Sequence, residues 1–160
     1  MKKQLFLLSM MLLSMSVGAQ ETVEIDGVWY HLDTNAQQAE VTYNPGGKYT
    51  GSVDIPVTVT YDGAEYRVTS IGNYAFYYSS SLTSVTMPNS VTAIGQCAFS
   101  YCHRLSSVTI PSRVTSIARE AFYDCSALNT VTIPNSVTTI GEYNQEIKGV
   151  TNVEVIPVSA

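Results

Sequence analysis

The chain has 160 residues, of which 45% are hydrophobic and 13% are charged, with a formal net charge of −5. This composition excludes an intrinsically disordered chain and a collagen, and three cysteines are too few for a dense disulfide scaffold. A surplus of carboxylates repels phosphate backbones, so nucleic acid is not expected as a partner. The length allows one domain with a hydrophobic core but not two of ordinary size.

Residues 1–19 have the pattern of a signal peptide. Two lysines follow the initial methionine, the run from Leu5 to Val17 is apolar apart from its serines, and small residues precede position 20. The apolar run has about 13 residues, whereas a membrane-spanning helix needs about 20. No later stretch approaches that length, and no cysteine near the cleavage site could accept a lipid. The sequence therefore predicts an exported chain, secreted or held at the cell surface or in the periplasm, without a transmembrane span after signal removal.

Residues 20–67 are expected to form a β-rich N-terminal cap. Asp26-Gly27 and Asp62-Gly63 each lie between apolar-rich segments, which is a strong signal for a β-hairpin, and Asn-Pro-Gly-Gly at 44–47 marks a third turn. The strand-like pattern at 53–56 recurs at 85–88, so residues 53–67 are interpreted as a modified zeroth repeat that contains a hairpin insert. Eight carboxylates against two basic side chains give this block a net charge of −6, which we expect to protect its end strand from pairing with other chains.

A period of 23 residues runs without a gap through the middle of the chain, with three copies over residues 68–136. A single copy cannot bury its apolar face alone, so copies must stack, strand on strand at about 4.8 Å, into a solenoid with a continuous core. Phe76, Phe99 and Phe122 are expected to form one internal stack. The predicted repeat core consists of Ile71, Phe76, Leu82, Val85, Ile94, Phe99, Leu105, Val108, Ile110, Ile117, Phe122, Leu128, Val131 and Ile133.

Each copy contains two extended segments. In Leu-x-x-Val-x-Ile-Pro the apolar residues point inward, and proline ends the strand because it has no N–H to donate to a ladder. In Val-Thr-x-Ile-Gly the β-branched residues favour a strand or extended arm, which the glycine allows to turn a corner. The Ala-Phe pair and the next six residues then lead the chain back to the next Leu-x-x-Val-x-Ile-Pro segment.

Residues 137–160 are interpreted as a degenerate fourth repeat that caps the C-terminal end. Asn144 and Gln145 stand where Ala and Phe belong, so this copy has lost its core aromatic residue. Ile156-Pro157 still falls one period after Ile133-Pro134, so the copy keeps its length while its interior becomes polar, as in a terminal cap. A truncated or decayed array is the alternative, because arrays of this kind usually run longer.

The full pattern Leu-x-x-Val-x-Ile-Pro-x-x-Val-x-x-Ile-Gly-x-x-Ala-Phe-x-x-Cys, at 82–102 and again at 105–125, resembles the BspA-like leucine-rich repeat of bacterial surface antigens. The resemblance covers residues 68–143. It implies a mainly β, leucine-rich-repeat-type, right-handed solenoid with an N-terminal β-hairpin cap. It also implies an extracellular or surface-attached binding protein, sometimes an adhesin, whose repeats have no catalytic activity. Ser79 in the cysteine position and Ala118 in the glycine position depart from the pattern.

The cysteines leave two possibilities open. Cys102 and Cys125 have the same phase in adjacent copies, which would place their α-carbons about 5 Å apart, close enough for a disulfide. Equivalent side chains in a ladder point in parallel, however, and the family resemblance favours a column of buried thiols. Cys97 is left over in either case. Cys97, Cys102 and His103 are residue types that bind zinc, but their spacing is irregular and no second pair exists, so no metal site is predicted.

Catalytic motifs are missing from the sequence. His31 stands alone, and two histidines without a companion nucleophile make no catalytic triad. Gly46-Gly47-Lys48 lacks the flanking residues of a phosphate-binding loop and is interpreted as a turn. None of the patterns H-E-x-x-H, G-x-S-x-G, G-x-G-x-x-G and C-x-x-C occurs. The chain is therefore expected not to be an enzyme and to need no cofactor.

Two surfaces are candidates for partner binding. Small hydroxyl side chains at the outward strand positions should form two columns on a flat, uncharged sheet face. Such a face suits contact with another flat surface, of a protein or a glycan. The two columns consist of Ser84, Thr86, Ser107, Thr109, Thr130 and Thr132. Tyrosines cluster near the same phase of the returning segments, beside Arg104 and Arg119, and both residue types are favoured at interfaces. These are Tyr74, Tyr77, Tyr78, Tyr101 and Tyr123.

The function predicted from the sequence is that of an exported, non-catalytic repeat protein. It would mediate adhesion-type protein–protein interaction at or outside the cell envelope. A glycan-binding module that uses the tyrosines, or a truncated structural remnant of a longer array, are the alternatives. The expected partner is thus a protein or glycan at the cell surface.

Overall fold

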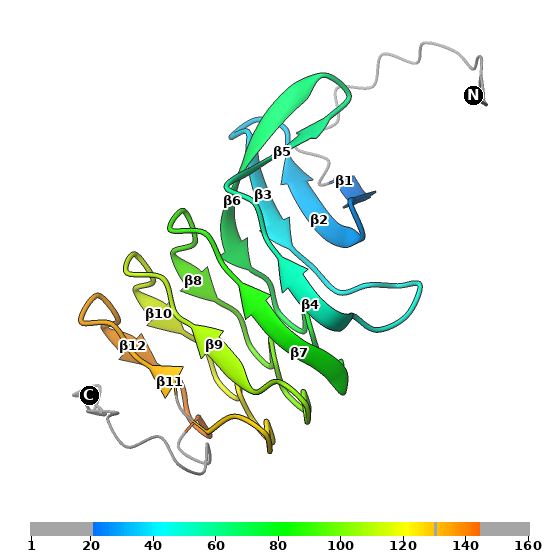
Figure 1. Cartoon of the computed structure of the whole chain (residues 1–160). Coiled ribbons are helices and arrows are strands. Elements are labelled where there is room, and N and C mark those ends of the chain that lie inside the picture. The colour runs from blue at the N-terminus through cyan, green and yellow to red at the C-terminus, as the bar shows by residue number, and fades with distance from the viewer. Residues whose placement is uncertain (1–20, 130, 145–160) are drawn as a thin grey trace.

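The computed structural model describes residues 21–129 and 131–144, and within this part of the chain it contains strands and turns but no helix. The strands form two sheets that make the two layers of a solenoid (Figure 1). One sheet has the order β1-β2-β3-β6-β8-β10-β12, with β5 paired to β6, and the other has the order β11-β9-β7-β4. The strands are β1 (Glu21–Ile25), β2 (Val28–Asp33), β3 (Gln38–Val41), β4 (Thr50–Asp54), β5 (Thr58–Tyr61), β6 (Ala64–Ile71), β7 (Ser81–Thr86), β8 (Ala93–Ile94), β9 (Ser107–Thr109), β10 (Ser116–Ile117), β11 (Val131–Thr132) and β12 (Thr139–Ile140).

Both hairpins predicted from the Asp-Gly pairs are present at the N-terminal end. β1 pairs antiparallel with β2 around Asp26-Gly27, and β5 pairs antiparallel with β6 around Asp62-Gly63. Aspartate and glycine both have positive φ in each turn, between 49° and 80°. Two-residue hairpin turns of type I′ need this conformation at both positions, and Asp-Gly adopts it readily.

The repeat period sets the register of both sheets. Val85 pairs with Val108 and Val108 with Val131, while Ile71, Ile94, Ile117 and Ile140 pair in succession in the other sheet. Each step is one copy of the repeat, so parallel pairing aligns identical phases. β4 joins the same ladder with Val53 opposite Val85, as expected if residues 53–56 are a strand of repeat type.

The solenoid interior holds an aromatic stack. Phe76, Phe99 and Phe122 are at most 1% exposed, and their ring centroids are 5.0 and 5.2 Å apart with interplanar angles of 7° and 1°. Tyr49 from the cap closes the N-terminal end of this stack, with its centroid 4.8 Å from that of Phe76. The other predicted core residues are also buried except Ile133, which is only partly buried because it lies near the C-terminal end of the described core.

The sequence suggested that the repeat glycines allow the chain to turn a corner, but the structure gives Gly95 a different role. Gly95 has no positive φ, so it is not there to make an unusual turn. A β-carbon built on Gly95 would lie 2.6 Å from the Asn73 nitrogen and 2.7 Å from the Gly72 carbonyl carbon of the preceding coil. At position 95 the absence of a side chain therefore permits the close approach of the preceding coil, whereas the next coil carries Ala118 at the same phase.

Asn144 closes the C-terminal end of the described solenoid. Its side chain is buried, donates to the carbonyls of Ala118 and Gly141 at 2.7 and 3.0 Å, and accepts from the Phe122 N–H at 3.3 Å. The Asn144 side chain thus accepts the Phe122 N–H in the way that the Ala98 and Ala121 carbonyls accept those of Phe76 and Phe99. The predicted signal peptide and residues 145–160 lie outside the described residues. Within the described part, no helix has the length and apolarity that crossing a bilayer requires.

Candidate functional site

The segments that return the chain between the two sheets form a hydrogen-bonded ladder of their own. The N–H groups of Phe76 and Phe99 donate to the carbonyls of Ala98 and Ala121 in the following coil, both at 2.7 Å. Residues with positive φ recur in this ladder at two phases, among them Tyr74, Tyr78 and Tyr101 at 58° to 61°. Among these residues Tyr74, Tyr78 and Tyr143 have exposed side chains, whereas Cys97 is buried.

This geometry produces a surface that we call the tyrosine edge. It consists of Tyr74, Tyr77, Tyr78, Tyr101, Tyr123 and Tyr143. Tyr78 stacks on Tyr101 with a centroid distance of 4.5 Å, and Tyr101 meets Tyr77 and Tyr123 edge-on at 5.8 and 5.5 Å. The structure therefore brings all five sequence-predicted tyrosines together.

A shallow recess of about 420 Å³ opens in the tyrosine edge. Its walls are Tyr74, Tyr77, Tyr101, Tyr123 and Tyr143, which come from four successive coils, and Cys97, Ser100 and Glu120 complete the lining. The Glu120 carboxylate lies 3.1 Å from the Arg119 guanidinium and accepts a hydrogen bond from the Cys97 thiol at 3.3 Å. The recess thus combines aromatic faces with one carboxylate.

Cations flank the tyrosine edge at both ends. The Lys48 ammonium lies 5.0 Å from the Tyr43 ring centroid and 5.8 Å from that of Tyr77, and it donates to the Tyr77 carbonyl at 3.0 Å. The Arg119 guanidinium lies 4.8 Å from the Tyr143 centroid. Arg104, expected beside the tyrosines, is exposed and takes part in none of the cation–π pairs of the described residues.

The sequence reasoning missed Tyr143, Lys48 and Glu120 as members of this surface. Tyr143 has the same phase as Tyr74, so the period could have identified it. Lys48 belongs to a cap loop outside the period, and only the folded chain places it over Tyr77. Glu120 has the same phase as Cys97, but only the folded chain shows that its carboxylate contacts the Cys97 thiol.

Desolvation raises the pKa of three groups in the recess, Tyr77, Tyr101 and Cys97. Desolvation is the largest cause that raises the pKa of Tyr77 and Tyr101, and neighbouring tyrosines add to it. Desolvation also raises the pKa of the Cys97 thiol, which donates to Glu120. At neutral pH the rings and the thiol are therefore uncharged, and Cys97 lacks the thiolate character of a catalytic nucleophile.

The hydroxyl columns lie on the sheet that contains β7, β9 and β11. Thr86, Ser107, Thr109 and Thr132 are exposed, whereas Thr130 lies outside the described residues. Ser84, expected to face solvent fully, is half-buried, and its hydroxyl donates to that of Ser52 on β4 at 2.9 Å. The columns therefore make a polar face, to which β4 adds one more row.

Cys102 and Cys125 are free thiols in the core. Each donates to a phenylalanine carbonyl one coil earlier, Cys102 to Phe76 at 3.1 Å and Cys125 to Phe99 at 3.0 Å. Desolvation raises the pKa of Cys102 well above its ordinary value and that of Cys125 to about 12. Of the two possibilities left open by the sequence, the structure shows the column of buried thiols.

Each histidine contacts one polar side chain at the surface. His31 Nδ1 lies 2.7 Å from the Thr22 hydroxyl, and His103 Nε2 lies 3.3 Å from an Asp124 carboxylate oxygen at the surface. In the part of the chain that the structure describes, His, Cys, Asp and Glu form no group of three that could hold a metal ion.

Comparison with protein families identifies the repeat. A model described as the BspA type leucine rich repeat region matches residues 65–157 in six copies, which is more than half of the chain. The chain belongs to the BspA-type leucine-rich repeat family.

Solved structures of leucine-rich repeat proteins share the fold. A leucine-rich repeat protein from Bacteroides capillosus has 33% identity to this chain and a TM-score of 0.71, over 82% of this chain and 96% of that chain. A protein from Bacteroides ovatus has 33% identity and a TM-score of 0.69 over 74% of this chain and 31% of its own. One from T. pallidum has 29% identity and a TM-score of 0.63, with coverages of 76% and 54%. No curated protein sequence matches the chain.

Proposed function

We propose that this chain is an exported, non-catalytic binding protein that attaches to a protein at or outside the cell envelope through the tyrosine edge. The observation that carries the proposal is the convergence of five tyrosines from four successive coils on one recess. The signal-like pattern of residues 1–19 supports export, and membership of the BspA-type family supports a repeat surface as the functional element.

The backbone under the tyrosine edge supports a role in contact rather than in folding. Tyr74, Tyr78, Tyr101 and Tyr143 all have φ between 58° and 61°. A non-glycine residue in the left-handed region costs roughly 1–2 kcal/mol, and asparagine or glycine would be tolerated better there. Stability alone therefore disfavours tyrosine at these four positions, which supports selection of the rings for binding.

The exposure and composition of the tyrosine edge favour a protein partner. Tyr74, Tyr78 and Tyr143 are 43%, 46% and 49% exposed, while Lys48 lies over the Tyr77 ring and Arg119 over the Tyr143 ring. Tyrosine supplies a large apolar area with a polar tip, and both tyrosine and arginine are enriched among the residues that contribute most to interfaces. The recess is shallow and open, which suits a protruding side chain of a protein surface.

A glycan is the second candidate ligand, and the recess is the observation that favours it. Aromatic faces on several sides of a small depression can stack on sugar rings, and Glu120 can accept hydrogen bonds from their hydroxyls. The carboxylate already accepts from Cys97 and pairs with Arg119, so it is held in position.

The test uses variants that remove rings without a cost to the backbone. Tyr78→Asn and Tyr101→Asn together delete the stacked pair and place asparagine where φ is positive, so the fold is retained. Binding of the mature chain to a panel of purified extracellular proteins and to a glycan array is measured before and after the change. Tyr61→Ala, on the distant β5–β6 hairpin, is the matched control.

The expected result is at least a tenfold weaker affinity for a protein of the panel in the double variant, with unchanged affinity in the control. Binding confined to the glycan array and lost in Glu120→Gln would assign the surface to a sugar instead. Equal binding by the double variant and the parent chain would remove the tyrosine edge as the site of attachment.

A further inference from the structure

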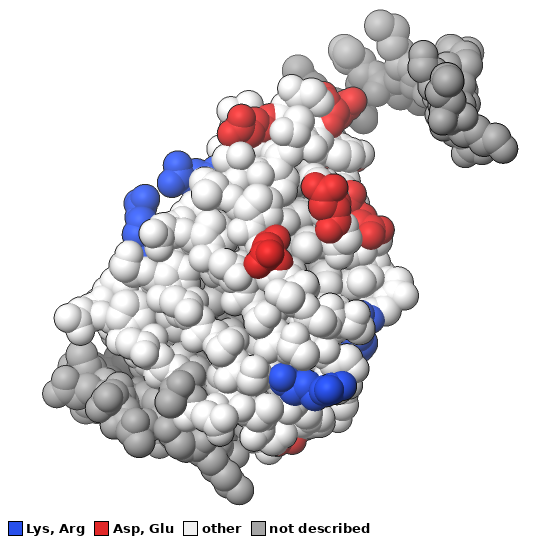
Figure 2. Space-filling view, in the orientation of Figure 1, with Lys and Arg blue, Asp and Glu red and all other residues white. Residues whose placement is uncertain are grey.

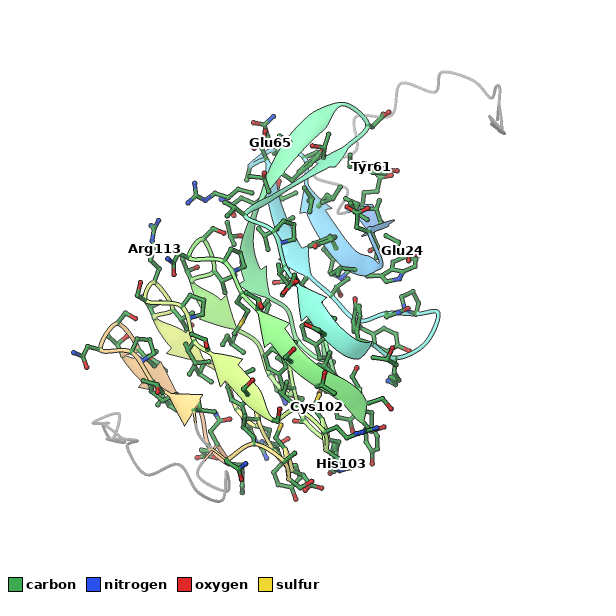
Figure 3. All side chains as sticks on the ribbon, viewed as in Figure 1. Glu24, Tyr61, Glu65, Cys102, His103 and Arg113 are labelled. Atoms are coloured by element: carbon green, nitrogen blue, oxygen red, sulfur yellow. The ribbon has the colours of Figure 1, made fainter. Side chains whose placement is uncertain are left out.

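A second column of side chains runs along the opposite edge of the solenoid. The position directly before the first valine of each copy is occupied in turn by Arg67, Ser90, Arg113 and Ser136, at exact steps of the repeat. Arg113 lies at one edge of the molecule, whereas His103 of a returning segment lies at another (Figure 3). This column is therefore separate from the tyrosine edge.

Three members of this column line one recess of about 540 Å³, which we call the arginine recess. Ser90 lies between Arg67 and Arg113, one coil from each, and Gln38, Thr69 and Thr92 form other parts of the wall. Parallel strands are spaced by about 4.8 Å, so the backbones of the two arginines are about 10 Å apart. Arginine side chains are long enough to converge on a single group across that distance.

The hydroxyl of Ser90 is the unusual group in this recess. Ser90 is 5% exposed, and its side-chain oxygen has no hydrogen-bond partner in the described structure. Ser136, at the same phase two coils later, donates its hydroxyl to the Val114 carbonyl at 2.7 Å. A serine at this position of the repeat can therefore form a hydrogen bond through its hydroxyl. The hydroxyl of Ser90 forms none, although Ser90 lines the same recess as Arg67 and Arg113. Buried polar groups without a partner are rare in folded proteins and are often found where a ligand or ion binds.

The charges around the recess favour an anion. Arg67 and Arg113 are both exposed, and the two ion pairs found among the described residues involve neither of them. Figure 2 shows two basic side chains close together at the edge where Figure 3 places Arg113. Glu40, the carboxylate next to the wall, already accepts a hydrogen bond from Ser70 at 3.0 Å. Glu65 lies two residues before Arg67, on the same face of β6.

We propose that the arginine recess binds a tetrahedral oxyanion of the sulfate or phosphate class. Arg67 and Arg113 would clamp the anion from two sides through charge-assisted hydrogen bonds, and the Ser90 hydroxyl would donate from the floor between them. Donors from three separate directions match the oxygens of a tetrahedral group. The anion is either a free ion or an ester group carried by a polymer, and both present the same oxygens to the site.

The experiment measures binding of sodium sulfate, sodium phosphate and dextran sulfate to the mature chain by calorimetry at constant ionic strength, with neutral dextran as the blank. Arg67→Ala and Arg113→Ala are each expected to weaken binding by at least tenfold. Ser90→Ala is expected to weaken binding about threefold. This loss is smaller than for the arginines because the buried Ser90 hydroxyl has to become accessible before it can contact the anion. Arg104→Ala removes one exposed charge away from the recess and is the charge-matched control.

Tighter binding of dextran sulfate than of either free ion, with the same order of variants, would identify a polymer-borne ester as the source. Similar affinities of dextran sulfate and the free ions, each counted per oxyanion, would identify the free ion as the ligand. Equal losses in Arg113→Ala and Arg104→Ala would overturn the site, because non-specific attraction depends on charge alone. The absence of binding by all three probes would also overturn it. Thermal melting of every variant distinguishes lost binding from lost folding, and Ser90→Ala is expected to melt no lower than the parent, since its hydroxyl has no partner to lose.

Discussion

Removal of one ring from the aromatic stack is the most direct test of how the coils are held together. Phe99 is fully buried and stands between Phe76 and Phe122, with centroid distances of 5.0 and 5.2 Å. Phe99→Ala deletes the central ring, and neither neighbour can fill the space because its backbone is fixed by the inter-coil ladder. Loss of transfer free energy together with a residual cavity predicts a destabilisation of about 3–5 kcal/mol.

That magnitude is a large fraction of the 5–15 kcal/mol by which a typical domain is stable. In a solenoid each coil depends on its neighbours, so the loss also uncouples the coils on either side. Urea denaturation followed by far-UV circular dichroism gives the free energy of unfolding, and Trp29 fluorescence reports separately on the cap. The exposed Tyr43→Ala serves as a control that should change stability by less than about 1 kcal/mol. Equal destabilisation by the two variants would refute the claim that the internal stack stabilises the fold.

Three further outcomes are expected. Tyr49→Phe removes the hydroxyl that accepts from the Trp29 N–H at 3.0 Å, so the free energy of unfolding should fall by about 1–3 kcal/mol in urea titrations; an unchanged value would contradict this. Gly95→Ala places a β-carbon 2.6 Å from the Asn73 nitrogen and should cost about 1–3 kcal/mol in the same assay, whereas a stabilised variant would show that the coils can separate freely. Burial raises the pKa of Cys125 from 9.0 to about 12, so only the unfolded chain ionises this thiol in that window, and the contribution of Cys125 to the free energy of unfolding should fall by about 1.4 kcal/mol per pH unit there, in addition to the loss from Cys102. Cys125→Ala should make this alkaline loss shallower, and an identical pH profile for variant and parent would argue against burial of the thiol.

The sequence by itself determined the features that depend on the period. Identical phases must pair when copies stack, so Val85, Val108 and Val131 and the three phenylalanines follow from spacing and apolar character alone. The Asp-Gly hairpins were also predictable, because few residue pairs adopt positive φ twice in succession. The gathering of the tyrosines at one edge follows from the same period.

Only the tertiary structure decided the features in which different phases or non-repeating segments meet. Tyr49 closes the aromatic stack from a cap loop, and Lys48 covers Tyr77, since the path of that loop is set by packing and not by any repeat. The need for glycine at position 95 comes from a 2.6 Å approach between coils, which no local pattern reveals. The unpaired hydroxyl of Ser90 likewise depends on burial and on atoms across the coil boundary. A period places equivalent residues on one line, whereas exposure and hydrogen bonding depend on every atom that surrounds that line.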